Sequence, residues 1–317
     1  MKSFFYGVLF FAFVGCSSGT AGLDDVLRVN HIQIKGTHNS FHTAPDPFVL
    51  IDWDYSFAPL DVQLQDQGVR QVELDVHYTP DHGFDVFHLP QIDQGTTCET
   101  FVECLSIVKK WSDGHPGHHL LFILVEPKDE IDQEKIAGHY DELDQEILSV
   151  WPRQRVLEPD DVRGAHATLR EALETDGWPS LGETRNKAMF IMLDSGQHRD
   201  AYLALHPNLE GAVFFARGGM GETWSSVMET GNLETIREAA MAGYLVRTTV
   251  GGPDDDPAGL GARANELLAA GAHIISTDYP AKEEDRDWWL DLPGGTPSRC
   301  NPVTAPAECT SEAVEDL

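Results

Sequence analysis

Three side chains that can bind metal ions or transfer protons alternate along one apolar stretch of the chain. Glu73, Asp75 and His77 are separated by Leu74 and Val76, and residues two apart on a β-strand point to the same side. The apolar set can then pack against helices while two carboxylates point into an interior. Because buried carboxylates without a counter-charge are unfavourable, this spacing predicts a cation beside Glu73 and Asp75.

Two further oxygen donors stand where other strand-like segments end. Asn39 follows one such segment and Glu126 closes another. With Glu73 and Asp75 they would supply four protein oxygens, and carboxylate and amide oxygens favour Ca²⁺ or Mg²⁺ over zinc or copper. The alternative for Glu73 and Asp75 is an ion-paired position at a sheet edge.

Two histidines occupy similar positions. His38 directly precedes Asn39, and His88 ends a short apolar segment. Imidazoles titrate near neutrality, so a pair of them can divide the roles of general base and general acid. With a cation between them, the natural substrate is a phosphodiester, whose charge the cation neutralises. The alternative is that both histidines only cap turns.

Two basic residues at strand ends are candidates for substrate binding. Lys128 lies two residues beyond Glu126, so both can face the site and Lys128 could bind phosphate, unless it is a surface lysine. Arg247 is either a cation on the substrate side or an ion-pair partner inside the fold.

The elements that must position these residues follow a repeated strand and helix pattern. Apolar, β-branched or aromatic runs predict eight strands, at residues 30–36, 70–77, 84–88, 119–126, 188–193, 212–217, 243–249 and 272–277. Helical periodicity fills most gaps, at residues 59–67, 99–112, 132–150, 232–242 and 258–270. Such alternation predicts an α/β fold of the (β/α)8 TIM-barrel type, with its site at the carboxyl ends of the strands.

We expect this barrel to be irregular between its second and third strands. Only residues 78–83 join them, which is too few for a helical crossover. An extended connection or a local hairpin must therefore replace the helix there. Residues 151–187 contain several Pro and Gly residues and are expected to form an insertion with a short helix.

The N-terminal segment has the features of an export signal. Lys2 precedes an apolar run that is too short to cross a bilayer, and the sequence Val14-Gly15-Cys16-Ser17 resembles a bacterial lipobox. We therefore expect a lipoprotein-type signal peptide over residues 1–15, lipidation of Cys16 and a linker over residues 16–27. The chain would then be exported, and either anchored by lipid to the bacterial cell envelope or secreted. A plain signal peptide with an incidental Cys16 is the alternative.

The other four cysteines fit an oxidising compartment. Cys98, Cys104, Cys300 and Cys309 form an even set without a CxxC spacing, which favours disulfides over a zinc site. Cys98–Cys104 and Cys300–Cys309 are the local pairings, although four cysteines allow three connectivities. We expect a catalytic barrel over residues 28–290 and a tail over residues 291–317 that is pinned by a disulfide.

The charge balance limits the partners. The 317 residues include 52 acidic and 22 basic side chains, for a formal charge of −30. This excludes nucleic acid as a partner, because phosphate binding needs clustered Lys and Arg. It also argues against simple electrostatic adhesion to an anionic membrane, although a bound cation would change that locally.

Taken in order, these motifs resemble the phosphatidylinositol-specific phospholipase C superfamily. The resemblance is carried by Gly36-Thr37-His38-Asn39-Ser40, Glu73-x-Asp75, His88 and Glu126-Pro127-Lys128. The later segment Ile275-Ser276-Thr277-Asp278-Tyr279-Pro280 and the tail sequence Arg299-Cys300-Asn301-Pro302 are similar to the Ca²⁺-dependent bacterial group. Related glycerophosphodiester phosphodiesterases usually have His-Arg-Gly where this chain has His38-Asn39-Ser40.

The resemblance implies a mechanism. His38 and His88 would be the catalytic histidines, and Ca²⁺ would be bound by Asn39, Glu73, Asp75 and Glu126. The inositol 2-hydroxyl would attack phosphorus, releasing diacylglycerol and a cyclic inositol phosphate. His88 would protonate the leaving oxygen, while His38 would contact the phosphoryl oxygens or share the role of base. Tyr279 and Trp224 are candidate aromatic contacts for the inositol.

Two other functions are compatible with these residues. The same site could hydrolyse glycerophosphodiesters, or the chain could be a non-catalytic Ca²⁺-binding surface lipoprotein. The histidine pair argues against the second function, because a binding site needs no general acid. We expect a monomer whose partner is a phospholipid substrate at a membrane surface.

Overall fold

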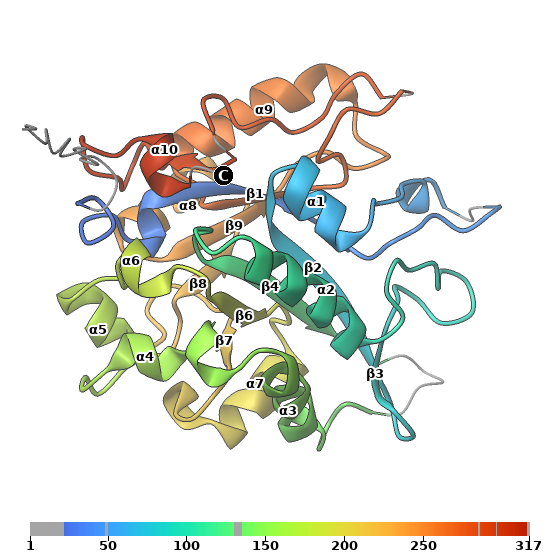
Figure 1. Cartoon of the computed structure of the whole chain (residues 1–317), viewed down its shortest axis with the longest axis horizontal. Helices are drawn as coiled ribbons and strands as arrows, with labels where there is room; N and C mark the ends of the chain where they lie inside the picture. The colour runs from blue at the N-terminus through green and yellow to red at the C-terminus, as the bar shows by residue number, and fades with distance from the viewer. Residues whose placement is uncertain (1–21, 48–49, 130–134, 285, 296, 316–317) are drawn as a thin grey trace, which may run out of the picture.

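The computed structural model describes residues 22–47, 50–129, 135–284, 286–295 and 297–315 (Figure 1). The expected signal peptide and Cys16 lie outside the described residues. No helix in the described part of the chain is both long enough and apolar enough to cross a bilayer.

Eight parallel strands form a curled sheet around the core (Figure 1). They are β1 (Ile32–Thr37), β2 (Val69–Thr79), β4 (Leu121–Pro127), β6 (Ala188–Met192), β7 (Phe214–Ala216), β8 (Val227–Glu229), β9 (Leu245–Thr249) and β10 (Ile274–Thr277). Along the sheet, their order is β7–β6–β4–β2–β1–β10–β9–β8. The two edges meet where Arg217, just after β7, bridges to Val227, and Gly218 N donates to Val227 O at 3.0 Å. The expected TIM-type α/β fold is confirmed.

One of the eight expected barrel strands is wrong. Residues 84–88 contribute to β3 (Gly83–Val86), which pairs antiparallel with β2 as a hairpin outside the barrel. Residues 78–83 are too few for a helical crossover but enough for a turn, so the chain reverses its direction there. The eighth barrel strand is β8, whose three residues are too few to show a period. Residues 217–226, which connect β7 to β8, contain no helix.

Helices cover the outer face of the sheet (Figure 1). The longer ones are α1 (Leu60–Asp66), α2 (Phe101–Gly114), α3 (Tyr140–Val150), α7 (Gln197–Leu205), α8 (Leu233–Met241) and α9 (Pro257–Ala270). Local sequence sets their ends: Asp256 caps the first turn of α9, Pro257 stands at its first position, and Gly271 ends it with φ 101°.

The expected insertion at residues 151–187 is built from short elements. It contains β5 (Val156–Leu157), α4 (Pro159–Arg163), α5 (Leu169–Thr175) and α6 (Leu181–Thr184). Short 3₁₀ turns are η1 (Val29–His31), η2 (Ile51–Trp53), η3 (Arg153–Arg155) and η4 (Pro207–Leu209). β5 pairs parallel with β6, so the insertion extends the sheet.

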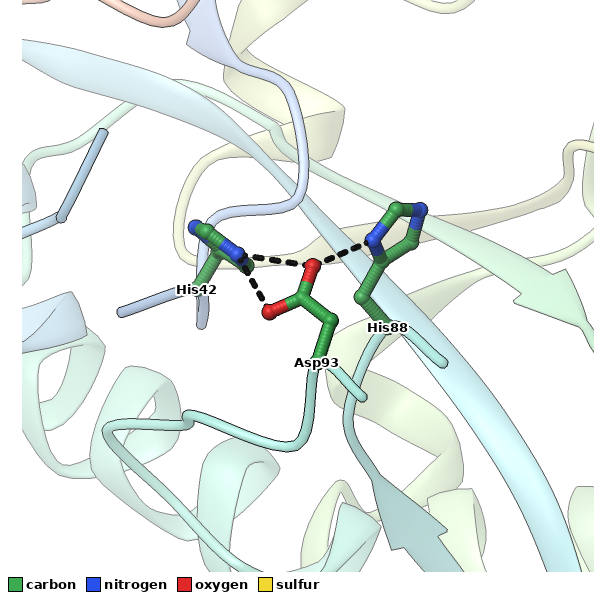
Figure 2. Close-up of side chains that lie close together, drawn as sticks. All are labelled: His42, His88 and Asp93. Carbon is green, nitrogen blue, oxygen red and sulfur yellow. Dashed lines mark hydrogen bonds and ion pairs between the residues drawn. The ribbon is translucent and has the colours of Figure 1, made fainter. Parts of the chain in front are cut away.

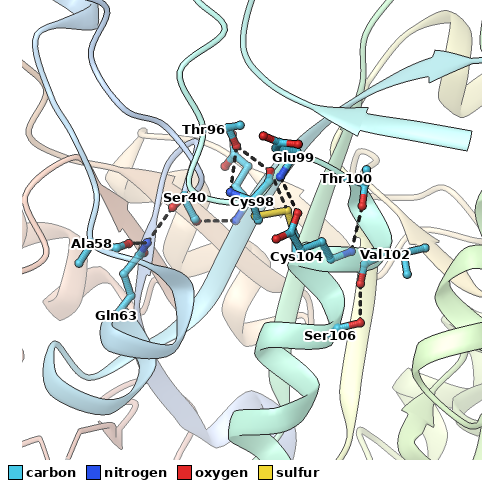
Figure 3. The surroundings of a disulfide bond; sticks show 12 residues. Ser40, Ala58, Gln63, Thr96, Cys98, Glu99, Thr100, Val102, Cys104 and Ser106 are labelled. Atoms are coloured by element: carbon cyan, nitrogen blue, oxygen red, sulfur yellow. Dashed lines mark hydrogen bonds between the residues drawn. A yellow bond between two sulfur atoms is a disulfide. The ribbon is translucent and has the colours of Figure 1, made fainter. Parts of the chain in front are cut away.

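Both local disulfides are present, Cys98–Cys104 and Cys300–Cys309. The first one joins the chain before α2 to the first turn of that helix (Figure 3). It thereby fixes the end of the long connection that follows β3.

The tail is held over more of its length than a disulfide alone would hold it. β11 (Arg299–Cys300) pairs antiparallel with β1, and α10 (Ser311–Val314) follows. The buried Glu315 forms an ion pair with the buried Arg70, Oε1 to Nη2 at 2.8 Å. Since Arg70 stands near the start of β2, the tail packs at the end of the barrel opposite the predicted site.

Candidate active site

Two neighbouring strands bring the three predicted carboxylates together. In the register of β2 and β4, Asp75 pairs with Glu126, and Glu73 lies two residues before Asp75. One oxygen from each of the three carboxylates lies within 4.8 Å of the others. Glu73 and Asp75 are 1% and 0% exposed, so their negative charges need a nearby cation.

Asn39 reaches the same region from the end of β1. It adopts a left-handed conformation, φ 47°. The next residue, Ser40, is tied to Glu73 by two bonds, Ser40 N to Glu73 O at 2.9 Å and Glu73 N to Ser40 Oγ at 2.7 Å. Asn39 Nδ2 donates to the Tyr55 hydroxyl at 3.2 Å, which leaves Oδ1 for another partner.

Unpartnered oxygens in this cluster fit a hard cation. Asn39 Oδ1 and Asp75 Oδ1 are buried without a hydrogen-bond partner among the described residues. Burial raises the pKa of Asp75 well above its ordinary value, and nearby Glu126 and Glu73 raise it further. Carboxylate and amide oxygens are the ligands that Ca²⁺ prefers, so the four predicted residues can hold this ion.

Lys128 lies among these carboxylates. Its Nζ is 3.2 Å from Asp75 Oδ2 and 2.9 Å from Glu126 Oε1. Burial alone would lower the pKa of Lys128, but Asp75 and Glu126 raise it above its ordinary value. With a side chain that is 17% exposed, Lys128 is not the surface lysine of the alternative, and it supplies positive charge at the metal-binding cluster.

His38 lies between two acidic groups. Its Nδ1 is 3.0 Å from Asp278 Oδ1 and its Nε2 is 3.9 Å from Glu73 Oε1. Desolvation alone would lower the pKa of His38, but the charge of Glu73 and the hydrogen bond to Asp278 raise it to about 9. Sequence reasoning missed Asp278, although it directly follows β10 and its position at a strand end was a usable signal.

Arg247 forms ion pairs inside the barrel and also lines the main cavity, so the structure is compatible with both interpretations of this residue. It binds Glu73 through Nη2, Glu229 Oε1 through Nη1 at 2.7 Å, and Ser276 Oγ through Nε at 3.1 Å. Glu229 also pairs with Arg217. Sequence reasoning missed Glu229 together with its strand, β8.

These groups line a cavity of about 710 Å³ at the carboxyl ends of the strands. Its lining includes His38, Glu73, Glu126, Arg217, Glu229, Arg247 and Asp278. Charges of both signs on one wall suit a ligand that carries hydroxyl groups and an anionic group.

The candidate aromatic contacts lie elsewhere. Tyr279 is 4% exposed, packs against Arg286 at 4.9 Å and borders a smaller pocket beside Trp288. It follows Asp278 directly, and consecutive side chains in extended chain point in opposite directions. Trp224 packs against Gly218, where any added Cβ would lie 2.6 Å from its ring. The structure therefore does not bring Tyr279 into the main cavity.

His88 is oriented by a carboxylate that sequence reasoning missed. Its Nδ1 lies 2.7 Å from Asp93 Oδ2 (Figure 2), and its ring edge contacts Trp53. The described residues that line the main cavity include His38 but not His88. Asp93 stands in an irregular loop without strand or helix periodicity, so no sequence pattern indicated its role.

Comparison with known proteins agrees with this geometry. A family model described as Ca²⁺-dependent phosphoinositide phospholipase C matches residues 27–83 and 78–302. No curated protein sequence is significantly similar to the chain.

Solved structures show the same fold. A Ca²⁺-dependent phosphatidylinositol-specific phospholipase C from Streptomyces antibioticus has a TM-score of 0.59 at 20% identity, covering 80% of this chain and 95% of that one. A calcium-dependent phosphoinositol-specific phospholipase C from Pseudomonas sp. in its apo form has a TM-score of 0.59 at 17% identity, covering 83% and 95%. Because the family model spans most of the chain, this protein belongs to the Ca²⁺-dependent phosphoinositide phospholipases C, a family of phosphodiesterases.

Proposed function

We propose that this chain cleaves phosphatidylinositol-type phospholipids into diacylglycerol and a cyclic inositol phosphate with the help of Ca²⁺. The observation that carries the proposal is the set of unpartnered oxygens of Asn39 and Asp75 beside Glu73 and Glu126. The same cavity wall holds His38. One of the similar Pseudomonas structures is a myo-inositol complex, which supports an inositol headgroup.

In this proposal, Asn39, Glu73, Asp75 and Glu126 hold the ion. Bound Ca²⁺ would neutralise phosphate charge in the transition state. Lys128 Nζ, within 3.2 Å of two of these carboxylates, can turn to a phosphate oxygen when the ion takes over their charge. Glu229 pairs with Arg217 and Arg247 in the lining of the same cavity, where its carboxylate can accept hydrogen bonds from ring hydroxyls.

The two histidines divide the proton transfers. The oxygen of the inositol 2-hydroxyl forms a bond to phosphorus and gives its proton to Nε2 of unprotonated His38, while Asp278 holds the opposite ring nitrogen at 3.0 Å. A cation beside Glu73 would favour this neutral form, because it offsets the negative charge that raises the pKa of His38. The bond from phosphorus to the diacylglycerol oxygen breaks, and this oxygen takes a proton from His88 Nε2. Water can then open the cyclic product by the reverse transfers.

Exposed apolar side chains support a lipid surface as the place of reaction. Leu50 and Ile51, between β1 and α1, are 50% and 51% exposed, and Ile92, between β3 and α2, is 50% exposed. These two connections also carry His38 and His88, so insertion of their apolar side chains would bring the site to the membrane. Export and lipid anchoring remain part of this proposal, as does a monomeric state.

The test is an assay on vesicles that contain phosphatidylinositol, with Ca²⁺ and with an excess of chelator. We expect release of diacylglycerol and cyclic inositol phosphate that stops without Ca²⁺. Full activity in chelator would contradict the metal site, and glycerol phosphate as the product from glycerophosphodiesters would favour the glycerophosphodiesterase alternative. Saturable binding of the lipid without any product would favour a binding lipoprotein.

A further inference from the structure

One carboxylate holds two histidines from different parts of the chain (Figure 2). Asp93 Oδ2 lies 2.7 Å from His88 Nδ1, and Asp93 Oδ1 lies 2.9 Å from His42 Nε2. His42 belongs to the connection after β1, whereas His88 and Asp93 belong to the connection between β3 and α2. The cluster therefore fastens together the two connections that carry the predicted catalytic histidines.

Of the three side chains, His88 is the one that can reach a substrate. His42 and Asp93 are 0% exposed, while the His88 side chain is 19% exposed. Figure 2 shows the second ring nitrogen of His88 pointing away from Asp93. Proton transfer to a substrate from this cluster must therefore pass through His88 Nε2.

The hydrogen-bond partners indicate which groups of this cluster donate and which accept. His42 Nδ1 lies 3.0 Å from the Tyr55 carbonyl oxygen, which can only accept, so Nδ1 donates. Burial alone would raise the pKa of Asp93, but hydrogen bonds from His42 and His88 hold it below its ordinary value. The ionised Asp93 holds one ring nitrogen of each histidine, His42 Nε2 at 2.9 Å and His88 Nδ1 at 2.7 Å.

The backbone around the cluster is tied down at several points. Leu89 and Asp93 exchange two backbone hydrogen bonds, at 2.9 and 3.1 Å, across the turn that follows His88. His42 forms a β-bridge with Thr96. The disulfide Cys98–Cys104 follows directly (Figure 3). Such fixing is what a proton donor needs to keep its geometry before the substrate arrives.

We propose that His42 and Asp93 are positioning residues that together prepare His88 to act as the general acid. Asp93 holds Nδ1–H and so directs Nε2 toward the leaving oxygen. His42 Nε2 lies 2.9 and 3.1 Å from the two oxygens of Asp93 and so keeps the carboxylate in the orientation that holds His88. When the bond from phosphorus to the diacylglycerol oxygen breaks, the Nε2 proton moves to that oxygen and a neutral Nδ1–H imidazole remains. This inference rests on the proposed function.

The test compares two leaving groups. Phosphatidylinositol releases an alkoxide that must be protonated, whereas a nitrophenyl ester of inositol phosphate releases a stable phenolate. We expect Asp93→Asn to lower turnover of phosphatidylinositol by about 10²-fold and His42→Gln by about 10-fold. Turnover of the nitrophenyl ester should fall by less than about 3-fold in both variants. Equal losses on the two substrates would overturn the inference.

A double-mutant cycle separates positioning from a general loss of structure. If Asp93 acts through His88, Asp93→Asn should cause no further loss in a His88→Ala background. The matched control is Asp144→Asn, because Asp144 is also a buried carboxylate but binds Tyr202 between α3 and α7. We expect this control to leave both rates unchanged. Additive losses in the cycle would overturn the positioning role.

A readout without turnover separates this inference from the proposed function. In nitrogen-15 spectra of histidine-labelled protein, the signal of a hydrogen-bonded Nδ1–H of His88 should be present in the wild type and altered in both Asp93→Asn and His42→Gln. A His88 signal that neither substitution alters would overturn the positioning roles even if the enzyme is active. A tightly bound zinc ion that disappears in His42→Gln would also overturn them, because the cluster would then hold a metal through unprotonated ring nitrogens. An inactive wild-type chain that shows this His88 signal would instead contradict the proposed function.

Discussion

The Lys128 ammonium lies 3.2 Å from the Asp75 carboxylate at the centre of the oxygen cluster. Lys128 also contacts Glu126, so two of the predicted metal ligands already share one positive charge. Glu73 pairs separately with Arg247, but Asp75 Oδ1 still has no hydrogen-bond partner among the described residues. The cluster therefore combines a fixed internal cation with room for a second cation.

Removing the charge of Asp75 should separate metal binding from folding. We expect Asp75→Asn to lose most of the thermal stabilisation that Ca²⁺ gives the wild-type chain, which amounts to about 2.7 kcal/mol at a hundred times the dissociation constant. Without Ca²⁺ the variant should unfold at the same or a higher temperature, since it no longer buries this carboxylate. Thermal unfolding with and without Ca²⁺ measures both effects, and an unchanged Ca²⁺ response would rule out Asp75 as a ligand.

Removing the positive charge of Lys128 should increase the affinity of the cluster for Ca²⁺. In Lys128→Met the carboxylates keep their charge, so we expect Ca²⁺ to bind at least about 10-fold more tightly, because two positive charges a few ångströms apart repel each other. Calorimetric titration with Ca²⁺ measures the affinity. Lys109→Met is a suitable control, since Lys109 pairs with Asp113 on α2. Weaker binding in Lys128→Met would show that Lys128 supports the metal site.

The hydrogen bond that Asp278 accepts from His38 Nδ1 should be needed for turnover. Asp278→Asn keeps the size of the side chain but removes the charge beside His38 Nδ1, and loss of such a carboxylate can lower turnover by about 10²- to 10⁴-fold. Steady-state kinetics on phosphatidylinositol measure this. Asp255 lines the same cavity and binds Gly252 N, so Asp255→Asn is the control. Equal, small effects of the two substitutions would exclude a special role for Asp278.

The oxygen cluster was predictable because two simple rules place its residues. Alternation along β2 directs Glu73 and Asp75 to one side, and the carboxyl ends of parallel strands meet at one end of a barrel. These rules extend to Asn39 and Glu126. They also indicate why Tyr279 is absent from the lining of the main cavity, because its neighbour Asp278 faces that cavity and adjacent side chains in an extended chain point in opposite directions.

The site residues and tail contacts that were not predicted depend on tertiary contacts, which no local sequence pattern encodes. Asp93 lies in an irregular turn, and its partner His42 comes from a distant segment that lies beside it only in the folded chain. Strand β8 has three residues, so its Glu229 could not be assigned to the barrel interior. The burial of Glu315 against Arg70 joins residues 245 positions apart, and tertiary packing alone decides such a contact.

The free energy of unfolding should depend on pH through the buried carboxyl group of Asp144. Burial raises the pKa of Asp144 to about 7, although a hydrogen bond from Tyr202 opposes the shift. The unfolded chain loses this proton near pH 4, so between pH 4 and 7 the folded state binds more protons and stability falls as the pH rises. We expect Asp144→Asn to lose less stability than the wild type between pH 5 and 8, by on the order of 2 kcal/mol. Urea unfolding across this pH range measures the difference. Identical pH profiles for the variant and the wild type would contradict the prediction.

The tail should contribute to stability without taking part in turnover. Glu315 Oε1 lies 2.8 Å from Arg70 Nη2, and Glu315 Oε2 lies 3.1 Å from His119 Nε2, all in side chains that are at most 2% exposed. Glu315→Gln would leave the Arg70 charge buried without its partner, which destabilises proteins by about 3–5 kcal/mol. Urea unfolding should show this loss, whereas the exposed Glu312→Gln on α10 should have little effect. Arg70 stands at the end of the barrel away from the oxygen cluster. The Ca²⁺ affinity and turnover of the folded variant should therefore match those of the wild type. A selective loss of either would show that the two ends of the barrel are coupled.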